Sequence, residues 1–433
     1  MTDEKALRIA SSKKATANRR KNMDCHTYQL KVDMSQLSKK QRNTLFMMFV
    51  EAKRVHNNII RWIDEGNGIN DYNCSVKAEV IVRNKNGDYE SKKLEYLPSG
   101  CIQDIKDEVV EALKSLKTHK EKGDKTGKLK YKADHYCLTF CQLTAGKGFI
   151  RGKHTVKIPK VDGLVRVNGL DQMQSYMELA EAQVLNTPKG YYIHIVTYSP
   201  KTSIVTNGKE LGIDFGIKTH LTFSTGEKRN VLVEETERLK KRQRSVARKK
   251  KGSNNRRKAR LLLEREYQKL TNQKNEKANQ LVHEILQYDH VYMQDEQLRG
   301  WAKFAFGKTI QHSVLGRVKA KLIRSDRVTV LDKWVPTSRL CICGRKKTDL
   351  TLADRMFKCN YCDYEEDRDV HAAKNMIRLG KLTKEELKDL LKQADSLVRQ
   401  ELAEFTPMEI KPSGMKSSKA IHGKANRRSG KVL

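Results

Sequence analysis

The residue types best suited to chemistry gather in one short stretch of this 433-residue chain. Two close pairs of cysteines are followed by two aspartates, in the order Cys341, Cys343, Cys359, Cys362, Asp367 and Asp369. Thiolates in two such pairs can converge on one tetrahedral ion, because each pair sits on a turn and the intervening chain folds back as a hairpin. A structural zinc is the expected occupant, and packing of reduced thiols in a small core is the alternative. With the aspartates, the pattern points to a metal-dependent nuclease.

Hydrolysis of a phosphodiester by two divalent ions needs three carboxylates gathered at one end of a sheet. Hard oxygen ligands of this kind suit magnesium. The first candidate is Asp214, on an expected strand at residues 211–215, where the flanking Gly212 and Gly216 leave room for a close approach. The alternative role for Asp214 is an Asx turn that closes a hairpin.

The other two carboxylates each have a neighbour that competes for the role. Glu296 follows an apolar strand expected at residues 290–294, and Asp295 is its rival, since one of the two could cap the following helix. Asp369 precedes an expected helix, and Asp367 is its competitor. Two residues apart on one strand, Asp367 and Asp369 cannot both face inward.

Net charge indicates a polyanionic partner. The chain has 87 Lys plus Arg against 52 Asp plus Glu, a formal charge of +35 and a pI near 9.8. Such a charge repels itself unless a polyanion neutralises it, which favours nucleic acid as the partner. No apolar stretch approaches twenty residues, so we expect neither secretion nor membrane insertion but a cytoplasmic protein. In that reducing compartment we expect no disulfides from the remaining cysteines: Cys25, Cys74, Cys101, Cys137 and Cys141.

The densest basic segment spans residues 238–260, where thirteen of 23 residues are Lys or Arg and none is acidic. A merely soluble helix would interleave Glu for compensating pairs, and none appears until Glu264. We therefore expect contacts with a phosphate backbone rather than with base edges. The expected nucleic-acid-binding residues are Arg248, Lys249, Lys250, Lys251, Arg256, Arg257 and Arg260.

The hydrophobic pattern of the N-terminal half predicts a small β-barrel with a helical lobe inserted between its strands. The barrel is expected from residues 25–34 and 133–200, and the lobe from residues 35–132. We expect basic segments at both ends, a flexible arm at residues 1–24 and a tail at residues 405–433. The expected barrel strands cover residues 26–32, 155–158, 164–167 and 191–198.

The C-terminal half predicts a second fold, from residues 201–336 and 365–404, with the cysteine module at residues 337–364. Its order is a three-stranded meander, helix, strand, helix, strand and helix, which is the element order of an RNase H-like fold. The small residues Ala372 and Ala373 would let the last helix pack tightly on the sheet. The expected strands are 211–215, 221–224, 230–233, 290–294 and 328–331, and the expected helices are 237–287, 313–324 and 370–379.

As a set, four motifs resemble one family. They are Gly-Ile-Asp-Phe-Gly-Ile-Lys around Asp214, Gln-Asp-Glu ending at Glu296, Pro-Thr-Ser before the cysteines, and Asp-Arg-Asp followed by Ala-Ala-Lys-Asn. The chain resembles the TnpB-like RNA-guided nucleases encoded by transposons, and their miniature relatives, the CRISPR-associated type V-F effectors. The resemblance covers most of the chain. Two departures are the one-residue spacer in the first cysteine pair and His371, where the family commonly has Asn.

The resemblance implies a multidomain α+β protein whose nuclease domain is RuvC-like. Asp214, Glu296 and Asp369 would be the catalytic ligands of two Mg²⁺ ions, and the cysteine module a zinc ribbon that binds target nucleic acid. A wedge-like oligonucleotide-binding barrel and a helical recognition lobe would hold a guide RNA and read a T-rich motif beside the target. The implied partners are guide RNA, double-stranded target DNA and its displaced strand.

Within the family, we favour a CRISPR effector of antiviral defence over a transposon-encoded nuclease. The polar insertion at residues 66–98 enlarges the helical lobe and would suit the asymmetric homodimer of the miniature effectors. A non-cleaving nucleic-acid-binding regulator is an alternative of another class, which would use the basic segment and zinc module without chemistry. A resolvase or transposase that needs no guide is the other enzymatic alternative, and it leaves the N-terminal half unexplained.

Overall fold

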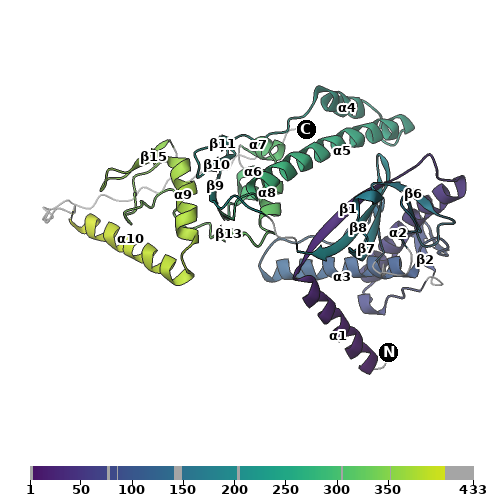
Figure 1. The fold of residues 1–433 in the computed structure, drawn as a ribbon. Helices are drawn as coiled ribbons and strands as arrows, with labels where there is room; N and C mark the ends of the chain where they lie inside the picture. Colours follow the sequence, from purple (N-terminus) through teal and green to yellow (C-terminus); the bar gives the residue numbers. More distant parts are fainter. Residues whose placement is uncertain are drawn as a thin grey trace, which may run out of the picture. The chain divides into compact units, whose positions relative to one another are not determined.

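The computed structural model describes residues 3–75, 79–84, 86–140, 149–201, 205–303, 306–351 and 353–404 (Figure 1). The chain forms two compact units: unit 1 is Met1–Ile204 with Thr236–Leu270, and unit 2 is Val205–Glu235 with Thr271–Leu433. Among the described residues, no helix is both long and apolar enough to cross a membrane. The expected tail at residues 405–433 and Cys141 lie outside the described residues.

Unit 1 contains a six-stranded antiparallel sheet in the order β4-β7-β8-β1-β6-β5. Buried and half-buried residues alternate along β8, as a strand with one face on a core requires. All four strands expected for this region are present, each with bounds shifted by a few residues at most. The strands are β1 (Met23–Val32), β4 (Cys137–Phe140), β5 (Thr155–Val156), β6 (Val165–Asn168), β7 (Glu178–Thr187) and β8 (Gly190–Pro200).

The first residues differ from the expected loose arm, because most of them form helix α1 (Asp3–Arg20). This segment contains no Gly or Pro and is rich in Ala, Lys and Arg, all good helix formers. At its end, the guanidinium of Arg20 donates to Glu178 of β7 at 2.7 Å and lies over the ring of Tyr198, 4.5 Å from its centroid. The arm is therefore fastened to the sheet through Arg20.

The expected helical lobe is built on α2 (Lys39–Asp64) and α3 (Ser99–Glu121), with a hairpin of β2 (Val80–Arg83) and β3 (Tyr89–Lys92) between them. A capping box at Ser38 starts α2. Glu51 of α2 is buried and accepts hydrogen bonds from three successive backbone N–H groups, those of residues 95–97, just before α3. This carboxylate ties the entry to α3 onto α2.

The helical stretch expected at residues 237–287 is two helices, α4 (Glu237–Ala247) and α5 (Asn254–Ile285). The break falls in the most basic part of the chain. Gly252 takes a φ of +83°, a backbone conformation that favours glycine, and so allows the turn between the two helices.

Unit 2 contains a five-stranded sheet in the order β11-β10-β9-β12-β13. The β9 strand pairs antiparallel with β10 and parallel with β12, and β12 pairs parallel with β13. The element order expected for this half is confirmed, except that the strand expected at residues 230–233 is displaced to β11. The strands are β9 (Glu210–Phe215), β10 (Leu221–Phe223), β11 (Lys228–Arg229), β12 (His290–Gln294) and β13 (Val328–Leu331).

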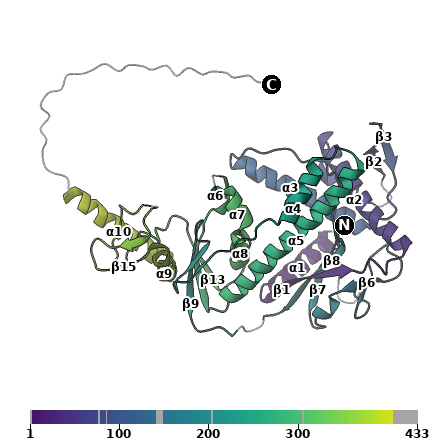
Figure 2. The ribbon, with the colours of Figure 1, turned by 90° about the horizontal axis from the view of Figure 1, so that it is seen from above.

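Helices cover both faces of this sheet, α9 (Arg368–Gly380) on one and α8 (Leu315–Leu322) on the other (Figure 2). Unit 2 also contains the part of α5 from Thr271 onward, together with α6 (Leu298–Lys303), α7 (Gly307–His312) and α10 (Lys384–Glu404). The tight packing expected from Ala372 and Ala373 is confirmed, since both are buried. A Cβ added to Gly212 of β9 would lie 1.8 Å from the carbonyl oxygen of Ala373, so α9 touches β9 backbone to backbone.

We predict that Gly212→Ala destabilises unit 2 by about 3 kcal/mol or more, because the added methyl meets backbone rather than a movable side chain. Urea unfolding followed by circular dichroism measures the loss. Gly316→Ala is the matched control, since a Cβ there meets open space on α8. It should leave stability unchanged or raise it by up to about 1 kcal/mol. Equal unfolding curves for the two variants would refute the close approach.

Candidate metal centres and nucleic-acid interface

The four cysteine sulfurs of the module lie within 4.8 Å of one another. The Sγ atoms of Cys341 and Cys362 are 3.6 Å apart, and those of Cys343 and Cys359 are 3.8 Å apart. Zinc bound to four thiolates at about 2.3 Å requires sulfur separations of about 3.8 Å. The expected zinc ligands therefore come together with a fitting spacing, and the short spacer of the first pair does not prevent it.

Turn geometry explains how a one-residue spacer is accommodated. The N–H of Cys341 donates to the carbonyl of Arg345 at 2.9 Å, and Gly344 takes a φ of +85° inside this loop. The second pair lies in the turn between β14 (Met356–Lys358) and β15 (Glu365–Asp367), where the N–H of Cys359 donates to the carbonyl of Tyr364. Each cysteine pair is thus held on a tight backbone turn.

Side chains of helix α9 pack against the cysteine module and form hydrogen bonds with it. His371 is buried, and its ring stacks on Phe357 at a centroid distance of 3.9 Å. Burial lowers the pKa of His371 to about 4, so the ring is neutral at pH 7. Asn375, one turn later, donates to the carbonyls of Thr337 and Leu340 at 2.8 and 2.6 Å. The His371 that departs from the family pattern thus belongs to the packing between α9 and the module.

Arg378 is a structural residue that the sequence analysis did not single out. Its guanidinium donates to the carbonyls of Cys341 and Ile342, at 3.0 and 3.1 Å, and so grips the first cysteine turn. The position of Arg378, eleven residues after Asp367 on the helix that follows the module, was the signal in the sequence that could have identified it.

The carboxylate of Asp214 lies half-buried on β9, opposite Thr222 of β10. Burial raises its pKa well above the usual value, and the charges of Asp369 and Glu296 raise it further. The pKa of Glu296, also half-buried, is raised by burial. The three expected carboxylates are therefore close enough for the charges of Asp369 and Glu296 to raise the pKa of Asp214. Among the described residues, the group found close enough together to hold a metal ion is the four cysteines.

Lys319 of α8 separates the roles of the two acids that follow β12. Its ammonium lies 2.6 Å from the carboxylate of Asp295, whose side chain is exposed, and also donates to the backbone carbonyl of Glu296. The Asp295 carboxylate is thus occupied by a lysine. The side chain of Glu296 makes no hydrogen bond or ion pair within the described part of the chain, so it remains available to a cation.

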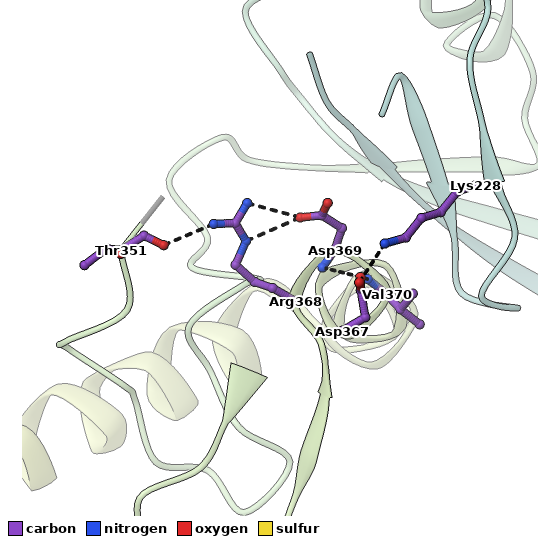
Figure 3. A network of polar contacts seen from close by, with 6 residues as sticks. All are labelled: Lys228, Thr351, Asp367, Arg368, Asp369 and Val370. Atoms are coloured by element: carbon purple, nitrogen blue, oxygen red, sulfur yellow. Dashed lines mark hydrogen bonds and ion pairs between the residues drawn. The ribbon is translucent and has the colours of Figure 1, made fainter. Parts of the chain in front are cut away.

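Asp367 and Asp369 also make different contacts: Asp367 caps helix α9, and Asp369 accepts hydrogen bonds from Arg368 (Figure 3). Asp367 caps α9, since its carboxylate accepts from the N–H groups of Asp369 and Val370 at 3.1 and 3.2 Å. Lys228 of β11 donates to the other oxygen of Asp367 at 2.6 Å. These bonds hold the pKa of Asp367 below its usual value, although burial opposes them. Asp367 therefore positions the helix that presents Asp369.

Arg368 connects Asp369 to the cysteine module (Figure 3). Its Nε and Nη2 lie 3.3 and 3.2 Å from one oxygen of Asp369, and its Nη1 donates to the carbonyl of Thr351 at 3.1 Å. Only one oxygen of Asp369 is engaged in this way. The orientation of that carboxylate thus depends on a loop of the module.

The expected nucleic-acid-binding residues in unit 1 divide into two groups. Arg256 is half-buried and donates to the carbonyls of Val246 and Lys249 at 3.0 and 2.6 Å, so it caps the end of α4. Arg260 pairs with Glu264 one turn along α5. Both are engaged within the protein. In the loop between the helices Arg248, Lys250 and Lys251 are exposed and Lys249 is half-buried, and Arg257 is exposed on α5.

We predict that Cys343→Ser weakens zinc binding at least tenfold, because one of four thiolates is lost. Competition with a chromophoric chelator measures the affinity. Cys343 is exposed, so the change removes a ligand without opening a core cavity. Cys25→Ser, which alters an exposed thiol on β1, should bind zinc as the wild type does. Unchanged affinity in Cys343→Ser would rule out a four-cysteine site.

We also predict that Asp214→Asn stabilises the protein in EDTA at pH 8. The folded-state pKa of Asp214 is raised, so its ionisation destabilises the folded protein increasingly as the pH rises above the unfolded-state pKa, and the cost is complete above the folded-state pKa. The advantage of Asn over Asp should therefore shrink as the pH is lowered from 8 toward about 4, the unfolded-state pKa of an aspartate. Denaturant unfolding across this range tests the sign, and an advantage that grows toward low pH would contradict it.

Two family models match segments of the chain. Residues 194–294 match the OrfB_IS605 family, described as "Probable transposase", and residues 316–376 match the family described as "Cas12f1-like, TNB domain". The first segment contains Asp214, and the second contains the four cysteines and Asp369.

Individual proteins are also similar. A Streptomyces pristinaespiralis protein described as "Putative RNA-guided DNA endonuclease" is 32% identical over 196 residues, which are 43% of this chain and 47% of that protein. The chain thus spans about half the length of the curated relative it matches. Two solved structures cover 83% of this chain: the mini-RNA-guided endonuclease CRISPR-Cas_phi3, over 93% of its length (TM-score 0.40, 8% identity), and CasPhi-2 (Cas12j) bound to crRNA, over 98% (TM-score 0.35, 10% identity).

The family models match the parts of the chain that hold the quoted motifs around Asp214, the cysteines and Asp369. The chain is therefore similar in these segments to the TnpB-like proteins and their miniature type V-F relatives, as its motifs indicate.

Proposed function

We propose that the protein is an RNA-guided DNA endonuclease with a single RuvC-like site. The observation that carries the proposal is the carboxylate of Asp214, whose pKa is raised by burial and by the charges of Asp369 and Glu296. Three acids that raise one another's proton affinity have excess negative charge, which a divalent cation relieves. Partial burial of charged carboxylates that bind no cation would lower the stability of the folded protein.

The strand order of unit 2 supports an RNase H-like assignment. In β11-β10-β9-β12-β13, an antiparallel meander is extended by two parallel strands, and α8 and α9 cover the two faces. Asp214 lies near the end of β9, and Glu296 follows the end of the adjacent parallel strand β12. Because the carboxyl ends of adjacent parallel strands lie at one edge of a sheet, this topology suits a shared metal site.

The oxygen donors of Asp214, Glu296 and Asp369 fit hard divalent ions, and these residues would hold two Mg²⁺ ions. When bound, the ions would supply an activated water and stabilise the charge on the leaving oxygen. The protein's own part is positioning. Asp367 fixes the start of α9, and Arg368 holds one oxygen of Asp369 while leaving the other free to bind.

We assign the nucleic acids to the basic surfaces. The exposed loop at residues 248–253 would contact a phosphate backbone, and the zinc-bearing module would contact target DNA with its displaced strand. The six-stranded sheet of unit 1, as an oligonucleotide-binding barrel, and the α2 and α3 lobe would hold guide RNA and read a T-rich motif. We retain an asymmetric homodimer as part of this proposal, with residues 66–98 as the contact.

A transposon-encoded RNA-guided nuclease is the second candidate, and the match of residues 194–294 to a transposase family favours it. Chemistry and site would be identical in both cases, since the two differ in the source of the guide. We propose the CRISPR effector of antiviral defence first because of the insertion at residues 66–98. RNA copurified from the native host separates them: a transcript with CRISPR repeats supports the first, and a transposon-end transcript supports the second.

We predict that Asp214→Ala, Glu296→Ala and Asp369→Ala each lower DNA cleavage at least a hundredfold and leave guided DNA binding intact, because each removes a metal ligand and none alters the basic surfaces. The assay cuts a plasmid library with randomised bases beside the target, using protein co-expressed with RNA from its own locus, with and without Mg²⁺.

Asp295→Ala is the matched control, since its carboxylate is exposed and paired with Lys319. It should cut at close to the wild-type rate. Loss of cutting in Asp295→Ala with full activity in Glu296→Ala would exchange the two assignments. Cutting without RNA would replace the proposal with a guide-independent resolvase or transposase, and RNA binding without any cutting would replace it with a non-cleaving regulator.

A further inference from the structure

A second candidate binding site lies in the helical lobe of unit 1, whereas the carboxylates and the cysteine module belong to unit 2. It is a groove of about 1040 Å³ between α2, the β2–β3 hairpin and the segment around Tyr131. Its side chains combine cations with aromatic rings: Lys53, Arg54, Arg61, Arg83, Tyr89 and Tyr131.

Two successive asparagines on α2 fix both walls of the groove. Asn57 donates to the carbonyl of Lys132 at 3.0 Å and accepts from its N–H at 2.8 Å, which fastens the segment around Tyr131. Asn58 accepts from the N–H of Ile81 at 3.2 Å and so fastens the hairpin. Because the walls are held by backbone hydrogen bonds, the groove is formed before any ligand arrives, which lowers the ordering cost of binding.

Charge in the groove favours an anion. Lys53 and Arg54 are half-buried, and neither makes a side-chain hydrogen bond or ion pair in the part of the chain that the structure describes. Other cations that line the groove are partly engaged, as Arg61 is by Glu65. Glu90, the acid that lines the groove, is paired with Lys92 at 3.3 Å. The two cations on α2 are thus available for phosphate.

Aromatic rings stand beside those cations. Tyr89 is 65% exposed and Tyr131 is 55% exposed, on opposite walls. The hydroxyl of Tyr131 donates to Asp64 at 3.0 Å, which holds its ring in place while the face stays open. Open aromatic faces next to unpaired cations are the combination that binds unpaired nucleotides, the rings by stacking on bases and the cations through phosphates.

We propose that this groove binds an unpaired stretch of polynucleotide, with a base stacked on Tyr89 or Tyr131 and the adjoining phosphate on Lys53 and Arg54. The inference rests on the proposed function, which assigns nucleic acid to the α2 and α3 lobe, and deepens it by naming the groove and the unpaired state of the strand that it binds. Unpaired guide RNA and displaced single-stranded DNA share this chemistry, and the two arms of the experiment separate them.

The experiment uses the full chain and 12-nucleotide single strands of identical sequence, one RNA and one DNA, that contain photoreactive 4-thiouridine or 4-thiothymidine. Binding is measured by anisotropy in 0.5 M salt, which suppresses general phosphate attraction. Crosslinked peptides are identified by mass spectrometry. We expect Tyr89→Ala with Tyr131→Ala to weaken binding about tenfold and to abolish crosslinks in the groove.

The control variants separate stacking from folding and from charge. Tyr89→Phe with Tyr131→Phe should keep wild-type affinity, since the rings remain. Tyr176→Ala removes a tyrosine of unit 1 that is 68% exposed and outside the groove, and it should bind normally. Lys53→Ala with Arg54→Ala should reduce the slope of log affinity against log salt by about two.

If the double alanine variant loses affinity for the RNA strand alone, the groove is assigned to the guide. If it loses affinity for the DNA strand alone, the groove is assigned to the displaced strand. Wild-type binding and unchanged crosslinks in the double alanine variant would overturn the proposal. A shift from dimer to monomer in sedimentation, with binding unaffected, would overturn it in favour of a protein contact. Every measurement is repeated in Asp214→Ala, so loss of cleavage and loss of groove binding are read separately.

Discussion

The contact between α9 and β9 is the constraint on which the rest of unit 2 depends. Gly212 allows the helix backbone at Ala373 to touch the strand, so the axis of α9 is fixed relative to the residues of β9. One helix then carries three separate tasks at successive turns. Asp369 stands in its first turn, His371 and Asn375 hold the cysteine module, and Arg378 near its end grips the first cysteine turn.

This arrangement makes the cysteine module part of the proposed nuclease site rather than an appendage. The side chains of α9 that pack the module and the acid that α9 presents cannot move independently, because the helix is rigid over this length. Arg368 adds a direct link, since it bonds both Asp369 and the carbonyl of Thr351. A metal-free module would therefore disturb the carboxylate through two routes, the packing of the helix and the loop that anchors Arg368.

The sequence was enough to predict the elements of unit 2 and the convergence of the cysteines, because strand periodicity and ligand spacing are local properties. It could not decide between adjacent acids. Lys319 engages Asp295 from 24 residues away, and Lys228 engages Asp367 from 139 residues away. The walls of the groove in unit 1 could not be predicted for the same reason, since Asn57 bonds to a segment 75 residues later in the chain. Helix α1 was missed because its basic composition resembles that of an unstructured arm.

Ion pairing differs among the acids of unit 2, and Asp369 is paired with its neighbour Arg368. Each acid that competes for a place in the site is neutralised by a lysine from another element, whereas Asp214 and Glu296 make no side-chain hydrogen bond or ion pair among the described residues. Leaving two half-buried acids unpaired lowers the stability of the folded protein. In a chain with a formal charge of +35, a nearby Lys or Arg could have paired with each of them. The cost is explained if a cation from solution completes the site, and that requirement favours a metal-dependent nuclease over a structural role for these carboxylates.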